Sequence, residues 1–116
     1  MKKINIIKDS RDFEFAIHKG KLYKNKDLIL YVINKNNKYY RFGISVGKKI
    51  SKRAVDRNLL KRRLRSIIDN NKKLYQNNLD YIIIMKKTCL DLSYQELEKS
   101  FLDIMKKVKG DYNEEK

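Results

Sequence analysis

Hydrophobic residues follow a helical period near the start of the chain. Three apolar positions recur at i, i+3 and i+4, and they are Phe13, Ala16 and Ile17. Asp9 or Ser10 can cap the amino end of such a helix, and Gly20 suits its carboxyl end. The spacing therefore predicts a first, short helix between these caps.

Two segments with an extended pattern follow. Residues 28–33 are all hydrophobic, and residues 39–46 alternate between bulky side chains and small or charged ones. The polar residues 34–38 lie between them and have the composition of a turn. We therefore predict a β-hairpin made of these two strands, and we expect a further short strand near residues 22–24.

The helical period returns in the middle of the chain, from Arg53 to about Asn71. A core stripe recurs there at i, i+4, i+7 and i+8, and it consists of Leu60, Leu64, Ile67 and Ile68. Residues 79–86 are then almost continuously apolar. Such a run is typical of a buried central strand.

A last helix is predicted by Ser93 and Glu96, which have the spacing of a capping box. Its apolar stripe consists of Leu97, Phe101, Ile104, Met105 and Val108. Gly110 is expected to end it. The predicted order is αβββαβα, a small sheet packed with helices in the α+β class. No proline or repeat divides the chain, so we expect one domain over residues 1–116, with a core at about 7–110 and a frayed C-terminal tail.

The strand predicted at residues 39–46 has two unlike faces. One face carries the bulky side chains of Tyr40, Phe42, Ile44 and Val46. The other carries Arg41, Gly43, Ser45 and Gly47, and apart from Arg41 it is nearly bare. Two interpretations are open. A helix packs closely on the bare face, as glycine in a strand often indicates, or the face is an open trough for a ligand strand.

The net charge of the chain indicates the class of partner that it binds. Its 116 residues contain 29 Lys and Arg against 14 Asp and Glu, which gives a formal charge of +15 at pH 7. This excess indicates a polyanion partner, nucleic acid before an anionic membrane surface. The single cysteine, Cys89, excludes an internal disulfide framework, and no run has the length of a signal peptide or a membrane span. We expect a cytoplasmic protein.

More than half of the excess charge lies between residues 48 and 65. This segment contains nine Lys and Arg, and Asp56 is its only acid. On a helix, a polar stripe forms beside the core stripe, and it consists of Asn58, Lys61, Arg62 and Arg65. A merely solvated face usually mixes both signs of charge, whereas these like charges repel one another. Arginine binds phosphate through a planar fork, so we predict a nucleic-acid surface.

RNA is favoured over DNA because the basic helix lacks the preceding partner of a helix-turn-helix motif. Single strands are often held by aromatic rings beside a positive groove, and Tyr31 and Phe13 are the candidate rings. The alternative is that both belong to the core. The chain has one histidine, His18, and no nucleophile motif or phosphate-binding loop. It therefore has few groups that could carry out acid–base or nucleophilic catalysis. We therefore predict no catalytic residue and no metal site in this chain.

The basic segment resembles the signature of the bacterial ribonuclease P protein family. The pattern Arg-Asn-x-x-Lys-Arg-x-x-Arg begins at Arg57 and ends at Arg65. A strand end of the form Gly-x-Ser-Val-x-Lys-Lys precedes it at residues 43–49. The resemblance covers roughly residues 7–108.

This resemblance implies a fold and a function. Family members have an α/β sandwich with a left-handed βαβ crossover, although a right-handed one is the general rule. In the family, an RNA with Mg²⁺ hydrolyses the phosphodiester that joins the 5′ leader to precursor tRNA, and the protein binds that RNA and the leader. The implied partners are ribonuclease P RNA and precursor tRNA, with Mg²⁺ held mainly by RNA. Neither a membrane nor a small-molecule substrate is expected.

The resemblance also assigns site residues. The basic helix would face the catalytic RNA with Arg53, Arg57, Asn58, Lys61, Arg62 and Arg65. The single-stranded leader would lie in a cleft formed by Phe13, Ile17, Tyr31, Ser45, Lys48 and Lys49. Ile17 stands where members often have a second aromatic residue, and Leu59 where a basic residue is common. The alternative function is a structural RNA-binding protein, for example a ribosome-associated one, without a processing role.

Overall fold

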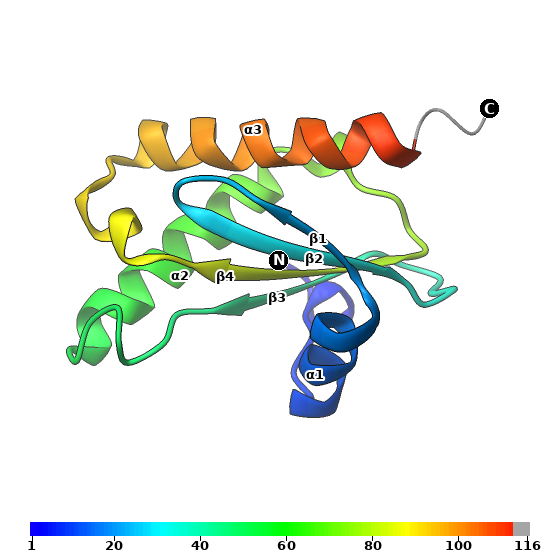
Figure 1. The fold of residues 1–116 in the computed structure, drawn as a ribbon, viewed down its shortest axis with the longest axis horizontal. Coiled ribbons are helices and arrows are strands. Elements are labelled where there is room, and N and C mark those ends of the chain that lie inside the picture. The colour runs from blue at the N-terminus through cyan, green and yellow to red at the C-terminus, as the bar shows by residue number, and fades with distance from the viewer. Residues whose placement is uncertain (113–116) are drawn as a thin grey trace.

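The structure is a computed structural model, and it describes residues 1–112. These residues form three α-helices and four strands in the predicted order αβββαβα, which confirms the mixed α+β class (Figure 1). The elements are α1 (Ser10–Lys19), β1 (Lys21–Lys24), β2 (Leu28–Asn34), β3 (Arg41–Ser45), α2 (Ala54–Asp69), β4 (Leu79–Met85) and α3 (Tyr94–Tyr112). Within this described part, no helix combines the length and the apolar character that a membrane crossing requires.

The strands form one sheet in the order β1-β2-β4-β3. The predicted hairpin of residues 28–33 and 39–46 is wrong, because β4 lies between β2 and β3 and pairs with both. Its apolar run, Leu79–Met85, suits this inner position, where both faces of a strand are covered. The short strand expected near residues 22–24 is confirmed as β1, and it forms the true hairpin with β2.

Strands β3 and β4 are parallel neighbours that α2 connects. Both arrows point to the left in Figure 1, β4 lies above β3, and α2 passes behind them. A helix on that side gives the crossover a left-handed sense, as the family resemblance implied and against the usual preference.

The large core fills the space between one face of the sheet and the helices α2 and α3. The predicted stripe of α2 lies in it, and so does the stripe of α3 that contains Phe101. From the sheet, Phe42 stacks on Tyr81 with ring centroids 4.6 Å apart. The face of β3 that carries bulky side chains is therefore the core face.

A smaller core lies on the opposite face of the sheet, under α1. Its fully buried members are Ile7, Ala16 and Ile82. Partly buried side chains pack around them, namely Phe13, Tyr31, Ile33 and Ile84. The helix α1 thus rests on the side of β3 that the sequence leaves nearly bare.

The helix ends follow the predicted caps with one exception. Asp9 accepts a hydrogen bond from the Arg11 amide at the start of α1, and Ser93 and Glu96 form the capping box of α3. Gly110 does not end α3, which continues to Tyr112. The next residue, Asp111, accepts a hydrogen bond from Tyr23 and lies 2.6 Å from the Lys21 ammonium, so contacts with β1 hold this turn helical. Of the tail predicted to be frayed, residues 111 and 112 are helical, and residues 113–116 lie outside the described residues.

Candidate nucleic-acid interface

Helix α2 carries the basic face that the sequence predicts. Its core stripe is buried, so the polar stripe turns away from the sheet. Of the predicted RNA-binding residues, Arg53, Asn58, Arg62 and Arg65 are exposed, whereas Arg57 and Lys61 are half-buried. Arg53 stands at the N-cap position and has no side-chain capping bond. The structure therefore brings these six residues together on one helix.

Asp56, the acid among the basic residues 48–65, bonds to the loop that leads into α2. Asp56 accepts a hydrogen bond of 2.9 Å from the Ser51 hydroxyl, and the Arg57 guanidinium donates one of 2.7 Å to the Ser51 carbonyl. These two bonds join the first turn of the helix to the preceding loop. Arg57 thus has a structural contact as well as a predicted role toward RNA.

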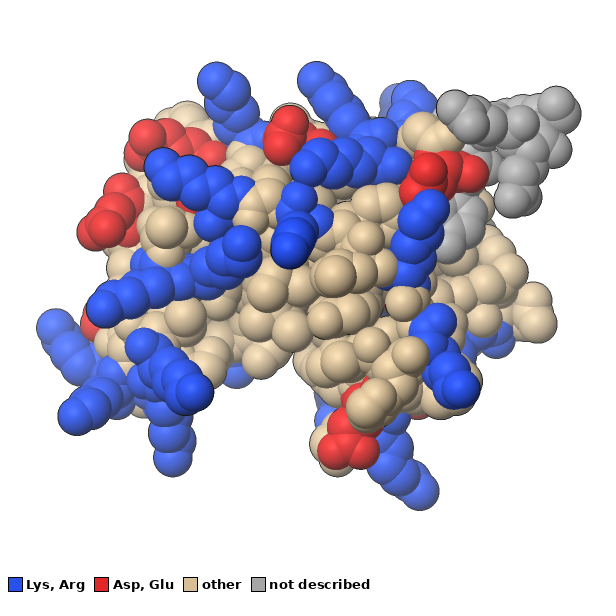
Figure 2. All heavy atoms as spheres, viewed as in Figure 1, with Lys and Arg blue, Asp and Glu red and all other residues tan. Residues whose placement is uncertain are grey.

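The cations between residues 48 and 65 lack carboxylate partners within the part of the chain that the structure describes. None of them forms an ion pair there, although five ion pairs occur elsewhere. Figure 2 shows lysine and arginine side chains gathered at the end of the molecule where α2 begins. Unpaired like charges on one helix weaken it by a few tenths of a kcal/mol for each pair about one turn apart. A polyanion that neutralises them removes this repulsion.

The residues predicted to bind the leader come from α1, β2, β3 and the loop after β3. Across the sheet, Tyr31 lies opposite Ile82, and Ile82 lies opposite Gly43. Phe13 covers the end of this row, because a Cβ atom on Gly43 would lie 2.6 Å from Phe13 Cζ. At this row the close-packing interpretation is confirmed, and the open-trough interpretation is wrong.

The sheet face is more open one row further along. Ser45 lies opposite Ile84, and Ile84 lies opposite Ile29, and all three are only partly buried. Lys48 and Lys49, in the loop after β3, are exposed. A face with apolar groups at its centre and two lysines at its end suits the bases and the phosphates of a single strand.

Two exposed apolar residues extend this face. Ile17 of α1, a predicted cleft residue, is 38% exposed. Leu22 of β1 is 47% exposed and lies opposite Tyr31, and it is not among the residues predicted from the sequence. The sequence Lys21–Lys24 has two adjacent apolar residues and no alternation, so the face on which Leu22 lies follows only from the pairing of β1 with β2. Phe13 and Tyr31 are partly buried, so each contributes to the small core and also reaches the surface.

The described residues do not fit a metal ion held by the protein. No group of three or more His, Cys, Asp or Glu side chains in residues 1–112 is arranged to hold one. Cys89 is buried, and burial raises the pKa of its thiol to about 11. A thiol in this state is protonated at neutral pH and is a poor nucleophile.

Comparison with known proteins identifies the family of this chain. The family model named Ribonuclease P matches residues 1–109. The ribonuclease P protein component of Streptococcus agalactiae is 36% identical over 106 residues, which cover 91% of this chain and 95% of that protein. A relative of such identity over almost the whole length indicates a shared fold and family.

Solved structures give the same result. A ribonuclease P protein from Staphylococcus aureus superposes with a TM-score of 0.83 at 30% identity, covering 90% of this chain and 95% of that one. The protein from Thermotoga maritima has a TM-score of 0.79 at 26% identity, covering 87% and 94%. The chain therefore belongs to the ribonuclease P protein family, and its function is that of a protein component in the maturation of tRNA 5′ ends.

Proposed function

We propose that the chain binds two RNA partners through two different surfaces and leaves the cleavage to RNA. The basic face of α2 binds ribonuclease P RNA, and the face formed by α1 and the sheet binds the single-stranded leader of precursor tRNA. The unpaired cations of α2 give this proposal its main support. A merely solvated helix would place acids among them, as the rest of the surface does.

On the basic face, arginine and lysine contact phosphates, and Asn58 adds a neutral hydrogen-bonding side chain. Arg62 and Arg65 are exposed and have no protein partner in the described residues, so their guanidinium groups are free to grip phosphate oxygens in pairs. Arg53 and Arg57 lie at the start of the helix, beside the loop that contains Lys48 and Lys49. The two proposed surfaces therefore meet at this loop.

On the leader face, the base of a nucleotide stacks on Tyr31 or Phe13, and the lysines at the end of β3 attract the backbone. Stacking on an aromatic ring tolerates any base, so the face would hold leaders of different sequence. Ile17 gives an apolar contact in place of a ring, which weakens stacking at that point.

Cleavage is assigned to the RNA partner. Mg²⁺ bound by that RNA supplies the metal chemistry of phosphodiester hydrolysis. The described residues support this division, since His18 is exposed and Cys89 is buried, with its thiol donating a hydrogen bond to the Asp27 carbonyl. We also propose that the protein acts in the cytoplasm, where both RNA partners are made.

Reconstitution tests the proposal. The protein is added to a bacterial ribonuclease P RNA, and cleavage of a precursor tRNA is measured across a range of Mg²⁺ concentrations. We expect the protein to lower the Mg²⁺ concentration needed and to bind precursors with a leader more tightly than mature tRNA. A ribosome-associated RNA-binding protein would change neither quantity, and cleavage by the protein alone would contradict the assignment to RNA.

A further inference from the structure

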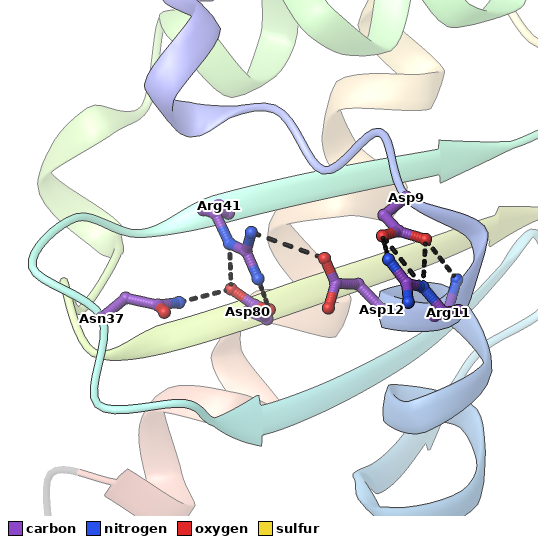
Figure 3. A network of polar contacts seen from close by, with 6 residues as sticks. All are labelled: Asp9, Arg11, Asp12, Asn37, Arg41 and Asp80. Atoms are coloured by element: carbon purple, nitrogen blue, oxygen red, sulfur yellow. Dashed lines mark hydrogen bonds and ion pairs between the residues drawn. The ribbon is translucent and has the colours of Figure 1, made fainter.

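A buried ion pair fixes one arginine on the sheet face under α1 (Figure 3). Asp80 of β4 is 1% exposed, and it lies opposite Arg41 in the parallel pairing of β3 with β4. The Arg41 Nε and Nη2 atoms donate to the two carboxylate oxygens of Asp80 at 2.9 and 2.5 Å. Asn37 donates a third bond to the same carboxylate at 2.6 Å. This bidentate geometry leaves the guanidinium little freedom to turn.

The remaining nitrogen of this guanidinium reaches helix α1. Arg41 Nη1 lies 3.6 Å from the carboxylate of Asp12, in the first turn of α1. The Asp80 carboxylate raises the pKa of Arg41, so the guanidinium is charged at every physiological pH. Since Arg41 and Asn37 already satisfy Asp80, Asp12 is not needed to balance the buried charge. Its ion pair instead joins α1 to the sheet.

Apolar packing alone holds α1 weakly. Among the described residues of α1, Ala16 is the only one that is fully buried. Helix α3 in comparison places five predicted apolar residues in the large core. One polar anchor therefore accounts for a larger share of the attachment of α1 than it would elsewhere in the fold.

The anchor lies beside a residue of the leader face. Phe13 follows Asp12 directly, and its ring rests against the backbone of Gly43 without space for a methyl group. A small shift of the first turn of α1 would move this ring away from Gly43. The position of the ring thus depends on where the first turn of α1 is held.

We infer that Asp12 is a positioning residue for leader binding: through Arg41, which is fixed on Asp80, it holds α1 so that Phe13 presents its ring to the leader. This inference rests on the proposed function of the leader face. Loss of the ion pair leaves the chain folded, because Asp12 is 28% exposed, but it lets α1 move on the sheet. Leader binding falls, and binding of mature tRNA does not.

The chain offers a matched control variant. Asp9 is the N-cap residue of α1, and its carboxylate pairs with exposed Arg11 at 2.8 Å rather than with the sheet (Figure 3). Asp9→Asn and Asp12→Asn raise the net charge by the same amount, and asparagine caps a helix as well as aspartate does. Added positive charge alone would strengthen RNA binding equally in both variants. Asp12→Glu keeps the charge and tests rescue.

The experiment compares precursor and mature tRNA binding to the reconstituted complex for the parent and these three variants. A partly exposed ion pair contributes about 0.2–1 kcal/mol, so we expect Asp12→Asn to lower precursor affinity by about 1.5- to 5-fold relative to Asp9→Asn. Asp12→Glu should recover most of the loss. Equal effects of Asp9→Asn and Asp12→Asn, or an equal loss of affinity for both tRNAs, would overturn the inference.

A second measurement separates this inference from the proposed function. Amide hydrogen exchange in α1 should be faster in Asp12→Asn than in Asp9→Asn, with unchanged exchange in α2 and α3. If the parent complex binds precursor and mature tRNA equally, the leader-binding proposal fails, but the exchange rates still show whether Asp12 anchors α1. Unchanged exchange in α1 would refute the anchor itself.

Discussion

Replacing Gly43 by alanine should disturb both the stability of the fold and the leader face. A Cβ atom at this position would lie 2.6 Å from Phe13 Cζ and 2.9 Å from Ile82 Cδ1. Carbon atoms in contact prefer separations of about 3.5–4.0 Å, so the ring must retreat by about 0.9 Å or more. Within residues 1–112 no glycine has a positive φ, so the substitution adds no backbone strain and tests packing alone.

Overpacking of this kind costs about 1–3 kcal/mol of unfolding free energy. The urea dependence of unfolding for small domains is about 1–3 kcal/mol per molar, so the midpoint of a urea titration should fall by roughly 1 M. Because the displaced ring belongs to the leader face, affinity for precursor tRNA should also fall, while affinity for mature tRNA should stay unchanged. Both quantities are measured on the same purified variant.

Three further variants make the result interpretable. Gly47→Ala is the matched control, since its new Cβ would meet one atom, the Lys49 amide nitrogen, at 4.0 Å. Phe13→Leu in the Gly43→Ala background removes the ring atoms that clash and should restore part of the lost stability, which a double-mutant cycle with Phe13→Leu alone would show. If Gly43→Ala unfolds at the same urea concentration as Gly47→Ala and the parent, the close contact between the Phe13 ring and Gly43 is refuted.

Four other predictions concern single residues. Tyr31→Ala should cost about 1–3 kcal/mol of leader stacking, measured as the difference between precursor and mature tRNA affinity, and equal losses would mean that Tyr31 is only a core residue. Lys61→Ala or Arg62→Ala should reduce the slope of log affinity against log salt by about 0.7–0.9 for each phosphate that the protein no longer neutralises, whereas an unchanged slope would place these side chains away from phosphate. Arg65→Lys keeps the charge and removes the planar fork, so it should leave the salt slope unchanged and still lower cleavage at low Mg²⁺; parental cleavage would argue against bidentate binding. The raised pKa of Cys89, about 11, keeps its thiol protonated at pH 8, so a thiol reagent should modify it no faster than the chain unfolds. The free energy of unfolding should decline as pH rises from about 8.5 toward 11, because in that range only the thiol of the unfolded chain ionises.

The parts of the fold that depend on local spacing were predictable from the sequence. The α2 stripe that includes Leu60 and Leu64 and the capping box at Ser93 follow from residues within one or two helical turns. The position of β4 between β2 and β3 was not predictable in this way. Strands that are consecutive in the sequence usually pair with each other, so β2 and β3 were expected to form a hairpin. In the structure both strands pair with the apolar strand β4 instead, and β4 comes later in the chain.

In the site as well, residues that lie within one element could be predicted, and residues placed by the packing of several elements could not. The basic face of α2 could be predicted because its residues lie within one helix. The contact of Phe13 with Gly43 could be stated only as one of two alternatives, since it depends on where α1 lies on the sheet. The contribution of Leu22 was missed for the same reason. The helical turn beyond Gly110 depends on contacts of Asp111 with β1, which no local pattern encodes.

The inner position of β4 also affects how the chain folds as it leaves the ribosome. When β3 has been synthesised, the strand beside which it will lie does not yet exist, and the chain must grow from Val46 to Met85 before the sheet can close. At about 5–20 residues per second, these 40 residues take about 2–8 seconds. During that interval the β1–β2 hairpin can pair and β3 can form its single bridge with Ile6, but the apolar side chains of β3, including Phe42, have no sheet to cover them. The nascent chain is therefore most open to aggregation and to chaperone binding in the seconds before its last strand emerges.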